Sequence, residues 1–315
     1  MAEKRVILVG DHRQLPHLLE PAVENEMAET QNFTEEQGKA LHDSLFERLW
    51  KQLKDREAID GFPRVVMLDT QFRMHPILGK FISEQFYESV GLAQLKAGKD
   101  AKDFPCDTPD YEGKVCAWIN VPLLPGNSER RLGTSRSWTR NDEAQVVAKE
   151  AVRLLNSCDA NTTIGIITFY SAQRDLIFEH LAQVGIAERD PDTQGWRISA
   201  DWRMTAKGEE RLRVGTVDGF QGKEFDIVLL SIVRSNNENI PTRTPDNLSQ
   251  FESAANRKYG HLRLDNRMNV AMSRQRRLLI SIGDKKMAIG ANAEVAVPAL
   301  SSFLKMCGGP DGIVR

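Results

Sequence analysis

The chain has 315 residues, of which 41% are hydrophobic and 27% charged, as in ordinary folded globular proteins. This composition excludes a disordered, collagenous or coiled-coil protein, and the longest apolar run, around Ile227–Val233, is far shorter than the roughly 18–20 residues of a membrane helix. The apolar run Val6–Val9 is too short for a signal peptide, so we expect a cytoplasmic or nuclear protein. At ~100–200 residues per domain, the length predicts about two domains, or one large α/β domain with insertions.

The net charge of −2 hides a segregation of charge along the chain. Residues 20–60 hold eleven acidic and five basic side chains, whereas residues 257–286 hold nine basic and two acidic ones. The second segment predicts a basic face that is suited to nucleic acid, which the whole-chain charge does not indicate.

Short runs that are apolar on both faces recur along the chain and predict buried strands of a parallel sheet. Between them, apolar residues at three- and four-residue spacing predict helices around residues 77–86, 144–155 and 176–181. Polar stretches predict loops at residues 20–40, 95–112 and 235–260. This alternation indicates an α/β fold with helices covering the sheet. The predicted strands are Val6–Val9, Val65–Leu68, Ile164–Phe169, Ile227–Val233 and Leu278–Ile282.

Four polar segments each follow an apolar strand and place polar or charged residues where the strand stops, which is where ligands of open α/β proteins bind. They read Gly10-Asp-His-Arg-Gln-Leu-Pro16, Gln71-Phe-Arg-Met-His-Pro76, Val217-Asp-Gly-Phe-Gln-Gly-Lys-Glu224 and Asn269-Val-Ala-Met-Ser-Arg274. In this order the segments resemble motifs III, IV, V and VI of the superfamily 1 helicases, in the branch that includes the nonsense-mediated-decay helicase and senataxin.

This resemblance implies a RecA-like P-loop NTPase fold, with a parallel sheet flanked by helices. Motif III closes the first motor domain of such helicases. Residues 1–62 are therefore expected to be the C-terminal remnant of a first RecA-like domain, and residues 63–315 to be a complete second one.

The resemblance assigns three residues to catalysis of ATP hydrolysis. Arg73 and Arg274 match the two arginines that reach the γ-phosphate from the second motor domain. Their guanidinium groups are planar and permanently charged, which suits them to phosphate oxygens. Gln14 matches the glutamine that senses the γ-phosphate, and its amide can both donate and accept. A surface ion pair for either arginine, and a backbone contact for Gln14, are the alternative interpretations.

Three more residues are assigned to nucleotide binding. Phe72 stands where an aromatic ring stacks on adenine, although an aromatic residue beside a strand is also typical of a core. Glu224 matches the glutamate that contacts the ribose, and Gly222 allows the tight turn before it.

Nucleic acid is expected to contact residues at strand ends. The resemblance assigns this role to Thr168, Phe169 and Thr216, and less firmly to Arg234. Hydroxyl groups and backbone amides bind phosphate without reading sequence, and aromatic faces stack on any base. Threonine is also common in strands for reasons of packing alone.

Two patterns that suggest chemistry have a simpler structural explanation. Neither His12 nor His75 has a second ligand at metal spacing, so we predict structural roles and no metal site. Asp142-Glu-Ala-Gln145 looks like helicase motif II, but it follows no apolar strand and opens an amphipathic helix that Asn141 is placed to cap. We therefore reject a catalytic role for it.

The sequence contains no Gly-x-x-x-x-Gly-Lys-Ser/Thr loop, because no Gly-Lys pair is followed by Ser or Thr. ATP and Mg²⁺ remain the expected ligands, with the loop and the Mg²⁺ ligands supplied by a missing N-terminal RecA-like domain in cis or in trans. We therefore expect a fragment, a split gene or one half of a two-chain enzyme, inactive alone. The predicted function is the C-terminal half of an ATP-dependent helicase on single-stranded DNA or RNA; the alternative is a non-catalytic nucleic-acid-binding module.

Overall fold

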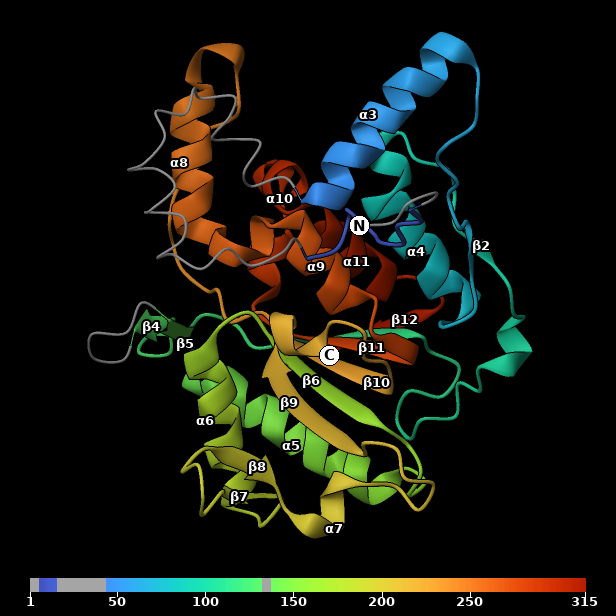
Figure 1. Ribbon diagram of the computed structural model, residues 1–315. Helices are drawn as coiled ribbons and strands as arrows, with labels where there is room; N and C mark the ends of the chain where they lie inside the picture. Colours follow the sequence, from blue (N-terminus) through green and yellow to red (C-terminus); the bar gives the residue numbers. More distant parts are fainter. Residues whose placement is uncertain (1–5, 16–43, 132–136) are drawn as a thin grey trace. The chain divides into compact units, whose positions relative to one another are not determined.

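The computed structural model describes residues 6–15, 44–131 and 137–315 (Figure 1). Contacts divide the chain into two compact units, Met1–Asp69 and Thr70–Arg315, which we describe separately. This boundary does not decide the predicted domain limits, 1–62 and 63–315, which stay predictions.

The larger unit is built on a six-stranded sheet whose paired strands are all parallel, in the order β12-β3-β11-β10-β6-β9. Three of these strands confirm the predicted ones at residues 164–169, 227–233 and 278–282. The other three are short or partly polar and did not stand out in the sequence. The strands are β3 (Cys116–Asn120), β6 (Ile164–Thr168), β9 (Leu212–Thr216), β10 (Phe225–Ser231), β11 (Gln275–Gly283) and β12 (Gly312–Val314).

Helices cover both faces of this sheet, as a parallel sheet requires (Figure 1). One face carries α5 (Asn141–Ser157) and α6 (Ser171–Ala182), whose apolar stripes pack on the strands in one core. The other face carries α4 (Pro76–Phe86), α9 (Asp265–Met272) and α11 (Pro298–Cys307). The predicted α/β fold is confirmed, and it is consistent with a RecA-like P-loop NTPase fold.

Smaller elements connect and edge this core. The α-helices are α7 (Ala200–Arg203), α8 (Leu248–Tyr259) and α10 (Ala291–Ala296). Two-stranded pairs are formed by β1 (Thr70–Gln71) with β2 (Lys96–Ala97), β4 (Arg130–Arg131) with β5 (Trp138–Thr139), and β7 (Ala187–Arg189) with β8 (Trp196–Ile198). The 3₁₀ turns are η1 (Glu88–Val90), η2 (Ala101–Asp103), η3 (Val217–Phe220), η4 (Pro245–Asn247), η5 (Gly260–Arg263) and η6 (Lys285–Ala288).

Helix α8 corrects the prediction of a loop over residues 235–260. Its buried side chains, Phe251, Ala254, Ala255 and Tyr259, recur at three- and four-residue spacing. The stripe was hidden because polar residues occupy the remaining positions.

The smaller unit contains α3 (Leu45–Asp60), which begins at the N-cap Ser44 and ends at Gly61 in the left-handed conformation. The predicted buried strands Val6–Val9 and Val65–Leu68 are wrong. Both runs lack strand structure, and Val9 and Val66 are 84% and 81% exposed. Among the described residues no neighbouring strand pairs with either run, and an apolar segment without such a neighbour gains little from an extended backbone.

Of the predictions for the starts of α4 and α5, the one for His75 is confirmed, and the one for the Asn141 cap is wrong. His75 has the predicted structural role, because it is the N-cap of α4 and its Nδ1 accepts the Ile77 N–H at 3.2 Å. Residues 142–145 lie in the first turn of α5, as predicted. Asn141 is not the cap, however; Arg140 is, and Asn141 Oδ1 instead contacts His180 Nε2 at 3.1 Å.

The His75 cap predicts a pH-dependent contribution to stability. Burial lowers the pKa of His75 below its ordinary value of 6.5. Since the neutral ring is favoured in the folded state, its contribution is fully present above pH 6.5 and is lost as pH falls through the folded pKa. Thermal unfolding should show that His75→Asn keeps the cap without this pH dependence, whereas His75→Ala costs about 1 kcal/mol at neutral pH. Equal pH dependence in the wild type and His75→Asn would contradict this role.

Candidate nucleotide and nucleic-acid sites

Residues of predicted motifs V and VI meet where β10 and β11 begin. The Phe225 N–H donates to the Arg274 carbonyl oxygen at 2.9 Å, and Phe225 pairs with Gln275 at the start of the ladder. Glu224 and Arg274 therefore precede neighbouring parallel strands at the same edge of the sheet. This corrects the prediction for motif VI, which lies at the end of α9 and before β11, and does not follow a strand. Motif IV joins this edge because the His75 N–H donates to the Arg276 carbonyl oxygen at 2.9 Å.

The Glu224 carboxylate lies between two arginines. Oε2 accepts from Arg73 Nε at 3.1 Å, and Oε1 accepts from Arg276 Nη2 at 2.7 Å. Partial burial acts to raise the pKa of Glu224, but the hydrogen bonds from Arg276 and Arg73 outweigh it and lower the pKa. The side chains of Arg73 and Arg276 are about one-third exposed, so this edge presents two accessible guanidinium groups to solvent.

Arg274 takes a different position from Arg73. Its side chain is 1% exposed, its Nε donates to the Val270 carbonyl oxygen at 3.1 Å, and its Nη2 donates to Ser273 Oγ at 2.8 Å. These bonds fix the guanidinium at the C-terminal end of α9, where backbone carbonyls favour a cation. Its predicted contact with the γ-phosphate stays a prediction.

Phe72 lies at the surface and not in the core. The ring is 59% exposed and rests on Gly98, where an added Cβ would lie 2.3 Å from Phe72 Cε1. The pairing of β1 with β2 brings Gly98 to this place, since its N–H donates to the Gln71 carbonyl oxygen at 2.7 Å. An exposed aromatic face beside Arg73 is compatible with stacking on a base.

The turn that ends at Glu224 is anchored by a buried ring. Phe220 is fully buried and packs on the glycines of two neighbouring strands, Gly165 of β6 and Gly215 of β9. Gly222 then adopts φ +76°, a left-handed conformation that side chains with a Cβ rarely take.

The predicted nucleic-acid residues lie near the opposite ends of the strands. Thr168 ends β6, Phe169 follows it, and both are buried. Thr168 Oγ1 has no hydrogen-bond partner among the described residues. Thr216 is half-buried at the end of β9. Arg234 is 3% exposed and forms an ion pair with Glu129 at 2.7 Å. The structure thus separates these residues from Glu224 and Arg274, and their contacts with nucleic acid stay predictions.

A large groove of about 1560 Å³ lies at this second edge. The indole of Trp138 lies under two guanidinium groups in it, with Arg131 Cζ 4.6 Å and Arg234 Cζ 5.0 Å from the ring centroid. Further cationic side chains that line the groove are those of Arg257 and Lys286. Basic and aromatic side chains in one groove are the combination that binds single strands without sequence preference.

Gln14 belongs to the smaller unit, where its Nε2 donates to Asp11 Oδ2 at 2.8 Å. In the same unit, the rings of His12 and Trp50 are 4.7 Å apart, a packing role for His12. The γ-phosphate contact of Gln14 stays a prediction. Among the residues that the structure describes, no group of three or more His, Cys, Asp or Glu is placed to hold a metal ion.

Comparison with known proteins defines the family. A family described as an AAA domain matches residues 41–286. The chain belongs to this family. It is 30% identical over 287 residues to a Neurospora crassa regulator of nonsense transcripts 1 homolog, covering 90% of this chain and 20% of the relative. It is also 27% identical over 290 residues to the Schizosaccharomyces pombe ATP-dependent helicase upf1, covering 91% and 24%.

A third relative is the DNA polymerase alpha-associated DNA helicase A of Saccharomyces cerevisiae, 26% identical over 291 residues, with 89% of this chain and 34% of the relative covered. The similarity confirms the predicted resemblance to the C-terminal motor region of superfamily 1 helicases, in the nonsense-mediated-decay branch. The chain spans about a fifth of the length of the nonsense-transcript regulators that it matches.

Two contributors to these sites were missed in the sequence. Arg276 holds Glu224 together with Arg73, and Glu129 pairs with Arg234. Arg276 stands in a run of three arginines within residues 274–277, which was a usable signal. Glu129 stands in an irregular polar segment that carries no pattern.

The left-handed conformation of Gly222 predicts that alanine is less stabilising at position 222 than at position 219 of the same turn. Gly222→Ala places a Cβ at φ +76° and should lower the free energy of unfolding by about 1 kcal/mol. Gly219→Ala is the matched control, because its Cβ meets nothing within 4 Å and its φ lies outside the left-handed region. Urea unfolding of both variants measures the difference, and equal stability of the two would contradict this account of the turn.

Proposed function

We propose that this chain provides the second motor domain of an ATP-dependent helicase, which couples ATP hydrolysis to movement along single-stranded DNA or RNA and to duplex unwinding. The observation that carries the proposal is the gathering of Arg73, Glu224, Arg274 and Arg276 where β10 and β11 begin, with the exposed ring of Phe72 on the residue before Arg73. Membership in a helicase family supports the same function.

Four of these residues suit parts of a nucleotide. Arg73 and Arg274 would neutralise charge on the γ-phosphate, Phe72 would stack on adenine, and Glu224 would accept a hydrogen bond from a ribose hydroxyl. Glu224 forms ion pairs with the guanidinium groups of Arg73 and Arg276. A bound triphosphate would compete for Arg73 and so leave Glu224 oxygens available to the sugar. Gly222 provides the turn that aims Glu224 at this position.

Hydrolysis requires a partner domain in this proposal. A phosphate-binding loop of the Gly-Lys-Ser/Thr type is absent from the sequence, and no metal-capable cluster lies among the described residues. A first RecA-like domain, in cis or in trans, would supply the loop and the Mg²⁺ ligands, and Gln14 would act beside it.

No helix within the described ranges is long and apolar enough to cross a membrane. A cytoplasmic location stays part of the proposal.

The test compares ATP hydrolysis by the chain alone with hydrolysis after a first RecA-like domain is added, with and without single-stranded nucleic acid. We expect no turnover by the chain alone and stimulated turnover by the pair. Turnover by the chain alone would contradict the need for a partner. Salt-dependent strand binding with no hydrolysis by the pair would favour a non-catalytic binding module.

Loss of an arginine should separate chemistry from strand binding. In the active pair, Arg73→Ala and Arg274→Ala should each lower turnover by roughly 10³-fold or more, because each removes positive charge from the transferring phosphate. Affinity for single strands should change little. Arg189→Ala, on the distant strand β7, is the control and should leave turnover unchanged. Equal losses of turnover and strand affinity in Arg274→Ala would indicate a structural arginine.

A further inference from the structure

The segment that follows β10 carries a strained turn. Val233 is fully buried and has φ +66°, a left-handed value that is unfavourable for a β-branched residue. The Arg234 N–H donates to the Ile232 carbonyl oxygen at 2.7 Å, which closes a γ-turn around Val233. A turn of this kind persists only where its surroundings hold it.

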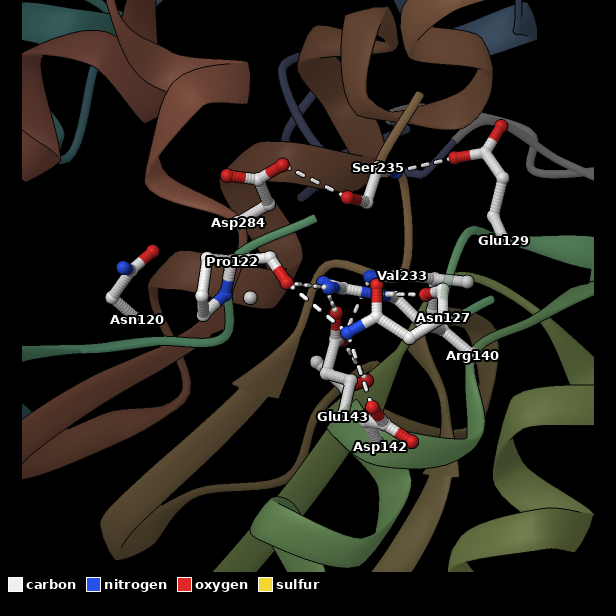
Figure 2. Close-up of polar contacts among 12 residues, drawn as sticks. Asn120, Pro122, Asn127, Glu129, Arg140, Asp142, Glu143, Val233, Ser235 and Asp284 are labelled. Atoms are coloured by element: carbon white, nitrogen blue, oxygen red, sulfur yellow. Dashed lines mark hydrogen bonds and ion pairs between the residues drawn. The ribbon is translucent and has the colours of Figure 1, made fainter. Parts of the chain in front are cut away.

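Three carboxylates from separate segments hold this turn (Figure 2). Glu143 Oε1, on α5, accepts the Val233 N–H at 2.8 Å. The Glu129 carboxylate accepts from Arg234 Nε at 2.9 Å and also from the Ser235 N–H. Asp284, directly after β11, accepts from Ser235 Oγ at 2.8 Å. The backbone from Val233 to Ser235 is therefore fixed from three sides.

Glu143 is the most deeply placed of the three and has no part in the nucleotide site. It is fully buried, accepts from Ser231 Oγ at 2.6 Å, and faces Arg140 Nη1 at 3.6 Å. Complete burial raises the pKa of Glu143 to about 7, although Arg140 and the bonds from Ser231 and Val233 act in the opposite direction. Burial of a carboxyl group costs free energy of folding unless its hydrogen bonds compensate.

Hydrogen bonds of Arg140 and Gln173 connect Glu143 to segments that adjoin the groove. Arg140 donates to the carbonyl oxygens of Asn127 at 3.0 Å and Pro122 at 2.8 Å, which fixes the segment after β3. The buried Gln173 donates to Ser231 Oγ at 3.1 Å and accepts the Arg140 N–H at 2.8 Å. Figure 2 shows Arg140 and Glu143 directed toward each other below the turn.

The held turn forms part of the groove of about 1560 Å³. Arg234 and Asn236 line it, and the Arg234 guanidinium lies 5.0 Å from the centroid of Trp138. The position of this wall depends on the backbone at Val233, because Arg234 and Ser235 follow it directly.

We propose that Glu143 is a positioning residue for single-stranded nucleic acid: by accepting the Val233 N–H, it holds the strained turn that places Arg234 and Asn236 in the groove wall. The inference rests on the proposed function, since it names a residue that prepares the strand-binding surface. Glu143 itself touches no nucleic acid, and it acts through the backbone.

The test measures binding of a fluorescein-labelled pyrimidine oligonucleotide to the full chain at low salt. Glu143→Ala leaves the Val233 N–H without its acceptor and should weaken affinity about tenfold. Glu143→Gln keeps an acceptor oxygen and should restore affinity to within about twofold of the wild type. The matched control is Glu150→Ala, on the same helix, where the carboxylate accepts from Tyr111 and Arg153 and does not line the groove. It should lower stability but leave affinity unchanged.

Hydrogen exchange at the Val233 amide gives a second measurement. It should speed up in Glu143→Ala and recover in Glu143→Gln, while exchange at Leu229 in the centre of β10 stays unchanged. If Glu143→Ala does not fold, Ser231→Ala replaces it, because it removes one of the groups that hold the carboxylate, and a loss of affinity of about two- to threefold is expected.

Two results would overturn the inference. One is wild-type affinity in a folded Glu143→Ala, and the other is an equal loss of affinity in Glu143→Ala and Glu150→Ala. Failure of the unaltered chain to bind any single strand would instead overturn the proposed function.

Discussion

The pairing of β10 with β11 is the constraint on which the candidate nucleotide site depends. The bond from the Phe225 N–H to the Arg274 carbonyl oxygen joins the starts of the two strands, and the residues just before them are therefore neighbours. Phe225, the donor, directly follows Glu224, and Arg274, the acceptor, is the first of the three arginines within residues 274–277. Since both strands are central in a sheet covered on both faces, their ends are rigid supports for charged side chains.

The same two strands also organise the opposite edge. After β10 the chain enters the turn at Val233, and after β11 it reaches Asp284, which helps to hold that turn. The candidate nucleotide site and the groove thus lie at the two ends of one pair of strands.

Much of the fold was predictable because the buried strands β6, β10 and β11 are apolar on both faces. Helix α8 was missed because its stripe is thin, and Val6–Val9 was wrong because an apolar run specifies burial but not a partner strand. For the site, the family resemblance pointed to Glu224, Arg73 and Arg274; the structure brings them to one edge of the sheet, and their roles stay predictions. Contacts between distant segments, such as Glu129 with Arg234, leave no local pattern.

Glu143 illustrates the same limit. The segment Asp142-Glu-Ala-Gln145 resembles a catalytic motif, and the structure places it in the first turn of α5, as the sequence predicted. The positive φ of Val233, which explains why a carboxyl group is buried there, is a property of the backbone that composition and periodicity do not encode.

The most direct test of the central claim is hydrogen exchange of the chain paired with a first RecA-like domain, with and without a non-hydrolysable ATP analogue. We expect the analogue to slow exchange at residues 71–74, 222–224 and 273–277 and to leave residues 129–131 at the groove unprotected. Protection at the groove with none where β10 and β11 begin would contradict it.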